Sequence, residues 1–87
     1  MPRLEKEIMI MNSQGLHARP AAQFVQISAK YESTIFVEKD GEKVNGKSIM
    51  GILMLGANHK SKVKVVVEGE DAEKLLVELE NFLTKNE

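Results

Sequence analysis

The chain has 87 residues, of which 43% are hydrophobic, and this length and composition predict one globular domain over residues 1–87. Its 12 basic and 13 acidic residues leave a net charge of −1, which argues against nucleic-acid binding, and the absence of cysteine excludes disulfides and thiolate metal sites. No apolar run is long enough to span a bilayer, and the charged N-terminus lacks the apolar core of a signal peptide. We therefore expect a cytoplasmic protein without membrane insertion.

The first 30 residues predict a strand and a helix. Residues 4–11 alternate in the manner of a strand. Apolar side chains over residues 18–29 recur at helical spacing. Proline fits only the first turn of a helix and disfavours helical geometry in the residue before it, so we expect the helix to begin at Pro20 and to end near Lys30. His17 would then lie just outside the helix.

A hairpin and a short helix follow. Residues 33–38 are rich in β-forming side chains, the Asp-Gly pair at 40–41 is a hairpin signal, and residues 43–45 predict a short return strand. Ser48 is a favourable N-cap for a short apolar helix that ends at Leu55. Glycines inside and after that helix weaken it.

A last strand and a last helix complete the pattern. Valines at alternate positions predict a strand over residues 62–68, and Asp71 predicts the N-cap of a final helix with a leucine-rich stripe. The element order is β-α-β-β-α-β-α, with one apolar stripe on each helix and one apolar face on each strand. The simplest arrangement is an α+β fold of two layers, with the helices on one side of an antiparallel sheet.

The heptapeptide Gly-Leu-His-Ala-Arg-Pro-Ala at residues 15–21 carries the most specific chemistry. It places an imidazole, a guanidinium and free backbone N–H groups at one helix N-terminus, which attracts a dianion. Neutral imidazole is a good nucleophile near neutral pH. We predict that His17 accepts a phosphoryl group and passes it on, and that Ala18 and Arg19 hold the phosphate. For His17 taken alone, a surface histidine beside a helix cap is the simpler interpretation.

A second motif, Lys-Ser-Ile-Met-Gly, occupies residues 47–51. Ser48 is either only a helix cap or a phosphorylation site at the positive end of a helix. We expect Ile52 and Leu55 to turn inward. The other apolar residues of the segment either belong to the core or form an exposed docking patch, which would consist of Ile49, Met50 and Leu53.

With these two motifs in this order, the chain resembles the HPr family, the histidine-containing phosphocarriers of the sugar phosphotransferase system, over essentially its whole length. The segment at 15–21 is similar to the family's active-site signature, and Val-Asn-Gly-Lys-Ser-Ile-Met-Gly at 44–51 resembles its regulatory-serine segment. The resemblance implies an open-faced β-sandwich of three helices over four antiparallel strands. It also implies a carrier rather than an enzyme. His17 would accept phosphate on Nδ1 from phosphorylated enzyme I and donate it to an enzyme IIA domain, and Arg19 would help to hold and release it.

The resemblance further implies that Ser48 matches the site modified by HPr kinase/phosphorylase, and that Met50 and its neighbours match the contact surface for partners. Phosphate on Ser48 would place a dianion in an apolar interface and hinder docking. Two alternatives remain: a regulatory module whose phosphoserine form binds a transcription regulator, and a carrier of the nitrogen-related branch, which the Leu-Met-Leu run at 53–55 favours. We expect a monomer with transient partner contacts and no cofactor.

The segment 57–61 departs from the glycine-containing turn of many family members. We expect Asn58 to supply left-handed backbone geometry there. His59 has neither an arginine nor a helix start beside it, so we interpret it as a surface residue. No pair of histidines or carboxylates has the spacing of metal ligands, so no metal site is predicted.

Overall fold

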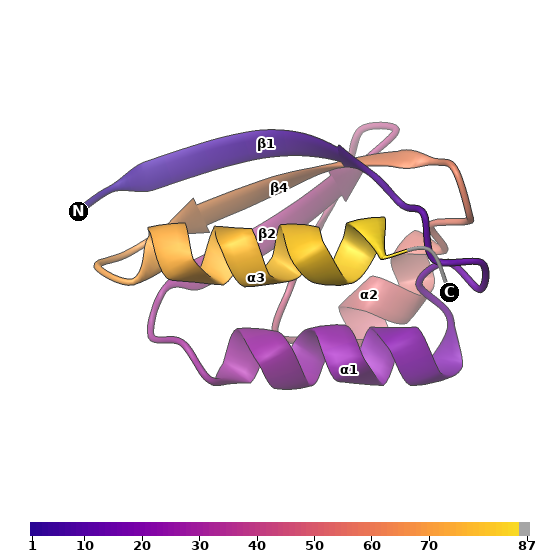
Figure 1. Cartoon of the computed structure of the whole chain (residues 1–87), viewed down its shortest axis with the longest axis horizontal. Coiled ribbons are helices and arrows are strands. Elements are labelled where there is room, and N and C mark those ends of the chain that lie inside the picture. The colour runs from indigo at the N-terminus through magenta and orange to yellow at the C-terminus, as the bar shows by residue number, and fades with distance from the viewer. Residues whose placement is uncertain (86–87) are drawn as a thin grey trace.

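The computed structural model describes residues 1–85, which contain four strands and three helices in the predicted order. The strands form one antiparallel sheet in the order β1-β4-β2-β3. All three helices lie on one face of it, with α1 and α3 side by side and the shorter α2 near the start of α1 (Figure 1). This confirms the two-layer α+β open-faced sandwich. The elements are β1 (Arg3–Met9), α1 (Ala18–Ala29), β2 (Thr34–Lys39), β3 (Glu42–Asn45), α2 (Ile49–Leu55), β4 (Lys62–Glu68) and α3 (Ala72–Thr84).

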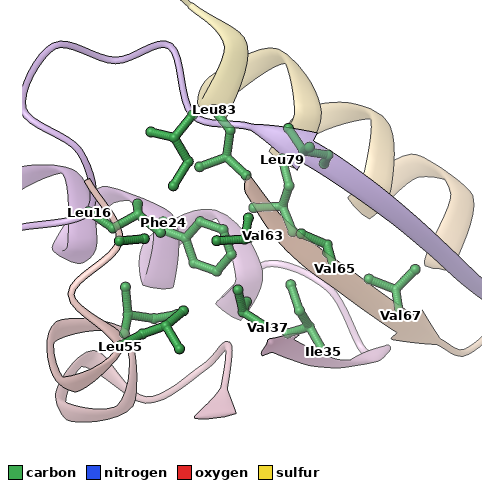
Figure 2. Packing of buried hydrophobic residues seen from close by; sticks show 14 of the residues in the cluster. Leu16, Phe24, Ile35, Val37, Leu55, Val63, Val65, Val67, Leu79 and Leu83 are labelled. Carbon is green, nitrogen blue, oxygen red and sulfur yellow. The ribbon is translucent and has the colours of Figure 1, made fainter. Parts of the chain in front are cut away.

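The hydrophobic core lies between the sheet and the helices. The alternate valines of β4 face the helices and are fully buried, as their spacing predicts. They meet Phe24 of α1 and Leu79 of α3, and Leu16 and Leu55 close one end of the core (Figure 2). Val66 is also buried, although it lies on the opposite face of the sheet, because β4 is a central strand and pairs there with both β1 and β2.

The helix α1 begins two residues earlier than predicted, at Ala18 rather than Pro20. Pro20 is therefore its third residue, where the missing N–H has no intrahelical carbonyl to bind, so the ring removes no helical hydrogen bond. The restriction that Pro20 places on Arg19 does not prevent a helical conformation there. His17 is the N-cap, with φ −105° and ψ 167°, and it lies just outside the helix as predicted.

The strand β1 is shorter at its C-terminal end than the predicted span 4–11, because the chain turns away after Met9. The N–H of Ile10 donates to the carbonyl of Ser61 at 2.9 Å, and the N–H of Met11 donates to the carbonyl of Leu83 at 2.8 Å. The second of these bonds joins the segment to the last turn of α3. The two layers are thereby tied together directly before the loop that leads to His17.

Asp71 is the N-cap residue of α3, but the prediction that its side chain caps this helix is wrong. Its carboxylate instead accepts hydrogen bonds from the backbone N–H groups of Glu32 and Ser33, at 2.9 and 3.0 Å, and from the hydroxyl of Ser33. These donors belong to the turn before β2. The hydroxyl of Ser33 and the N–H of Glu32 hold the pKa of Asp71 below its ordinary value.

Candidate phosphoryl-transfer site

The imidazole of His17 is exposed to solvent at the N-terminus of α1. The backbone carbonyl of His17 accepts the N–H of Ala21 at 3.1 Å, while the side chain of His17 makes no capping bond. The N–H groups of Ala18 and Arg19 belong to the first turn and have no carbonyl within the helix to bind. Pro20 has no N–H. Two backbone donors and the positive end of the helix dipole are therefore available beside the imidazole.

The guanidinium of Arg19 is the cation that the sequence places nearest to His17. The side chain is exposed, and within residues 1–85 it forms no ion pair with an acidic side chain. It borders a shallow polar hollow of about 250 Å³. The other residues that line this hollow are Asn12, Ser13, Gln14, Pro20 and Gln23. Its charge is therefore not neutralised by a carboxylate of this part of the chain, and it remains available to an incoming anion.

A tight turn and a buried leucine hold the loop before His17. The side-chain oxygen of Asn12 accepts the N–H of Gln14 at 2.8 Å, and its carbonyl accepts the N–H of Gly15 at 3.0 Å. The side chain of Leu16 is buried in the core, and its N–H donates to the carbonyl of Ala57 at 2.8 Å. The exposed imidazole thus stands directly between a fixed hydrophobic residue and the first turn of α1.

Asn58 is a neighbour of His17 that the sequence interpretation missed. Its Oδ1 lies 2.9 Å from Nε2 of His17, a contact between residues 41 positions apart. The backbone prediction for Asn58 was wrong, because the left-handed conformation within 57–61 belongs to Lys60, with φ 71°, and the other one nearby to Gly56, with φ 60°. No local pattern indicates the side-chain contact, since it depends on the packing of the loop after α2 against the loop before α1.

Ser48 caps α2, as predicted. Its hydroxyl oxygen accepts the N–H of Gly51 at 3.1 Å, and its side chain is partly buried. The other end of α2 leads through Gly56 to Ala57, whose carbonyl binds the N–H of Leu16. A helix of this length spans about 10 Å. The helix α2 therefore has Ser48 at one end, and the segment at its other end is hydrogen-bonded to the loop that carries His17.

The exposed face of α2 is apolar. Ile52 and Leu55 are buried, as expected, and the remaining large side chains of the helix point to solvent. We call this surface the α2 patch, and its members with their exposed fractions are Ile49 (43%), Met50 (63%), Leu53 (37%) and Met54 (72%). Met54 was not predicted, although its spacing of four residues from Met50 is a signal that could have identified it. A contiguous exposed apolar surface of this kind is typical of a binding site for another protein.

Residues 1–85 contain neither a second histidine in a setting like that of His17 nor a metal site. His59 is exposed, as expected, and makes no side-chain hydrogen bond within residues 1–85. The same residues contain no group of three or more histidine or acidic side chains placed to hold a metal ion. Among the helices described, none has the length and apolar character needed to cross a membrane.

Known proteins resemble this chain in both sequence and fold. The family model for the PTS HPr component phosphorylation site matches residues 4–85. The HPr-like protein Crh of Halalkalibacterium halodurans is 43% identical over 82 residues, which are 94% of this chain and 98% of that protein. The crystal structure of the phosphocarrier protein HPr from Bacillus anthracis matches with a TM-score of 0.92 at 41% identity, and the match covers 95% of this chain and 99% of that one.

A further solved structure is that of Crh from Bacillus subtilis, which is described as a catabolite repression protein and a dimer with swapped domains. It matches with a TM-score of 0.77 at 42% identity, over 85% of each chain. These relatives include both a phosphocarrier protein HPr and the HPr-like proteins called Crh. Since the family model spans nearly the whole described chain, the protein belongs to the HPr family of the phosphotransferase system.

Proposed function

We propose that this chain carries phosphoryl groups on His17 from phosphorylated enzyme I, which is charged from phosphoenolpyruvate, to an enzyme IIA domain of a sugar phosphotransferase system. The observation that carries the proposal is the exposed imidazole at the N-terminus of α1, beside two available backbone donors and the guanidinium of Arg19. The chain acts between two enzymes and is not itself a complete enzyme. Its partners supply and remove the phosphate.

The chemistry requires a lone pair on the imidazole. In the first step the lone pair of Nδ1 of His17 attacks phosphorus, and the bond from phosphorus to the donor atom of enzyme I breaks with its electron pair. The N–H groups of Ala18 and Arg19 and the guanidinium then face the transferred oxygens. In the second step the acceptor of enzyme IIA attacks phosphorus, and the bond to Nδ1 breaks and returns its electron pair to the ring.

Incubation with enzyme I and labelled phosphoenolpyruvate tests this proposal. We expect the wild-type chain to take up a label that is lost in acid and that is absent from His17→Ala. The matched control is His59→Ala, which removes the other exposed histidine and should leave the labelling unchanged. Equal labelling of His17→Ala and the wild type would refute the proposal. So would the absence of label from the wild type when the same enzyme I phosphorylates a known carrier.

A second role of the same chain is favoured by the position of Ser48. This residue caps α2 at one end of the α2 patch, which we propose as the docking surface for enzyme I and enzyme IIA. We propose that HPr kinase/phosphorylase modifies Ser48, that the added dianion hinders docking on the patch, and that the phosphoserine form binds a transcription regulator. Similarity to Crh supports this role.

A kinase assay on the wild type and Ser48→Ala tests the second role. We expect label on the wild type alone, and we expect the Ser48-phosphorylated protein to accept phosphate from enzyme I more slowly than the unmodified protein. Equal labelling of both chains would remove the role of Ser48. Transfer to His17 would remain possible, because the two residues carry separate modifications.

The proposed working form is a cytoplasmic monomer. A shuttle has to leave each partner quickly, which favours a single chain with transient contacts. The strand β1 pairs along seven residues with β4 of the same chain, so no strand exchange is needed to complete this sheet. Sedimentation at rising protein concentration should give the mass of one chain, and a stable species of twice that mass would contradict the monomer.

A further inference from the structure

The contact between Asn58 and His17 has a chemical consequence for the nucleophile. An amide oxygen accepts hydrogen bonds and does not donate them. Since Oδ1 of Asn58 lies 2.9 Å from Nε2, the hydrogen bond requires a proton on Nε2 of His17. In a neutral imidazole with a proton on Nε2, the lone pair in the ring plane is on Nδ1. Nδ1 is the atom that has to attack phosphorus in the proposed function.

The backbone of Asn58 is held from both sides, so the contact does not depend on a free loop. On one side, Ala57 accepts the N–H of Leu16 at 2.8 Å. On the other, the carbonyl of Asn58 accepts the N–H of Ser61 at 3.0 Å and its hydroxyl at 2.6 Å. Gly15 is packed so closely that an added Cβ would come within 2.9 Å of the Cα of Asn58. The loops before α1 and after α2 therefore form one packed unit.

We propose that Asn58 is a positioning residue for phosphoryl transfer: it keeps the proton of His17 on Nε2 and limits rotation of the exposed ring, so that the Nδ1 lone pair is ready for attack. This inference rests on the proposed function of His17. A neutral acceptor suits the task. A carboxylate in the same place would favour the protonated imidazolium, which has no lone pair, and would repel an incoming phosphate.

The test measures the tautomer and the transfer rate separately. His59→Gln provides the background, because it leaves His17 as the only histidine of the chain. In ¹⁵N-labelled protein above the pH at which the ring is protonated, two-bond ¹H–¹⁵N correlations give the ratio of the Nε2–H to the Nδ1–H tautomer. We expect Nε2–H to dominate and Asn58→Ala to lower the ratio about 2- to 10-fold, the effect of one ordinary hydrogen bond.

Asn58→Asp is the rescue variant for the tautomer, because its carboxylate still accepts from Nε2. We expect it to restore Nε2–H dominance while remaining slow with enzyme I, owing to its charge. We expect Asn58→Ala to reduce the rate of phosphorylation about 2- to 10-fold with an unchanged midpoint of thermal unfolding, since the side chain is exposed and outside the core. A purely structural role would lower the midpoint and leave the tautomer ratio of the folded protein unchanged.

Three results would overturn the proposal: a wild-type ring protonated mainly on Nδ1, an unchanged tautomer ratio in Asn58→Ala, or a changed ratio with an unchanged transfer rate. Failure of the proposed function would look different. In that case the wild type would take no label from an active enzyme I, while the tautomer ratio would still report whether Asn58 holds the Nε2 proton.

Discussion

Replacement of Gly15 by alanine should disturb both the stability and the candidate site. Gly15 has φ +67°, a left-handed conformation that costs an L-residue about 1–2 kcal/mol. The added Cβ would also lie 2.6 Å from the carbonyl oxygen of Ala57 and 2.9 Å from the Cα of Asn58. Both neighbours are backbone atoms and cannot rotate away, so the two loops have to separate and weaken the bond between Leu16 and Ala57, which is worth about 1 kcal/mol.

Together these effects should lower the free energy of unfolding by about 2–3 kcal/mol. For a domain of this size that change lowers the unfolding midpoint by roughly 8–24 °C. The matched control is Gly41→Ala, at the hairpin between β2 and β3. Gly41 has φ +84°, but an added Cβ there meets no atom within 4 Å. It carries the backbone penalty alone, and we expect a loss of about 1–2 kcal/mol.

Urea and thermal unfolding followed by circular dichroism would measure both variants, and phosphorylation by enzyme I would report on the site. We expect Gly15→Ala to lose more stability than Gly41→Ala and to accept phosphate more slowly, because Asn58 is displaced from His17. Equal losses of stability in the two variants would refute the steric part of this reasoning. A loss below about 0.5 kcal/mol in both would refute the backbone part as well.

Three further predictions concern stability. Ser48→Ala removes the bond from the N–H of Gly51 and should lower the free energy of unfolding by about 1 kcal/mol in urea titrations; an unchanged midpoint would show that the cap contributes nothing. The hydroxyl of Ser33 and a backbone N–H lower the pKa of Asp71, so the ionised carboxylate stabilises the folded chain above the unfolded-state pKa, and this contribution is lost as the pH falls through the folded-state value. The stability difference between the wild type and Asp71→Asn should therefore shrink from pH 7 to pH 2, and a difference independent of pH would contradict this assignment. Phe24→Ala leaves a cavity at a fully buried position and should lower the free energy of unfolding by about 3–5 kcal/mol, whereas a loss below about 1 kcal/mol would mean that the core collapses around the site.

The features that depend on nearby residues could be predicted from the sequence. The order of the elements, the capping by Ser48 and the inward faces of Ile52 and Leu55 follow from patterns within one turn or one strand. The exposed position of His17 beside a helix start also follows from its own heptapeptide, because Pro20 restricts where that helix begins. The fold class then followed from the requirement that each apolar face be covered.

The features that depend on distant residues could not be predicted. The contact of Asn58 with His17 joins residues 41 positions apart, and Asp71 binds Ser33 across 38 positions. From local propensity, Asn58 is predicted as a turn residue and Asp71 as a helix cap. The contacts that determine their roles are with distant residues and form only when the loops pack. Val66 is a similar case, since its burial depends on the two strands that flank β4.

The proline in the first turn of α1 affects how strongly a phosphate is held at His17. A helix start without proline would offer a third backbone donor at position 20, whereas this one offers those of Ala18 and Arg19. A hydrogen bond to a charged group is worth about 1.5–3 kcal/mol, so a third donor whose bond is lost in the transition state would slow transfer of the phosphoryl group by about 10- to 150-fold. A phosphoryl carrier has to keep its phosphohistidine form high in free energy, because a strongly stabilised phosphohistidine passes its phosphoryl group on slowly. In the proposed function, Pro20 therefore favours transfer of the phosphoryl group to the next partner, because it leaves the phosphate with one backbone hydrogen-bond donor fewer.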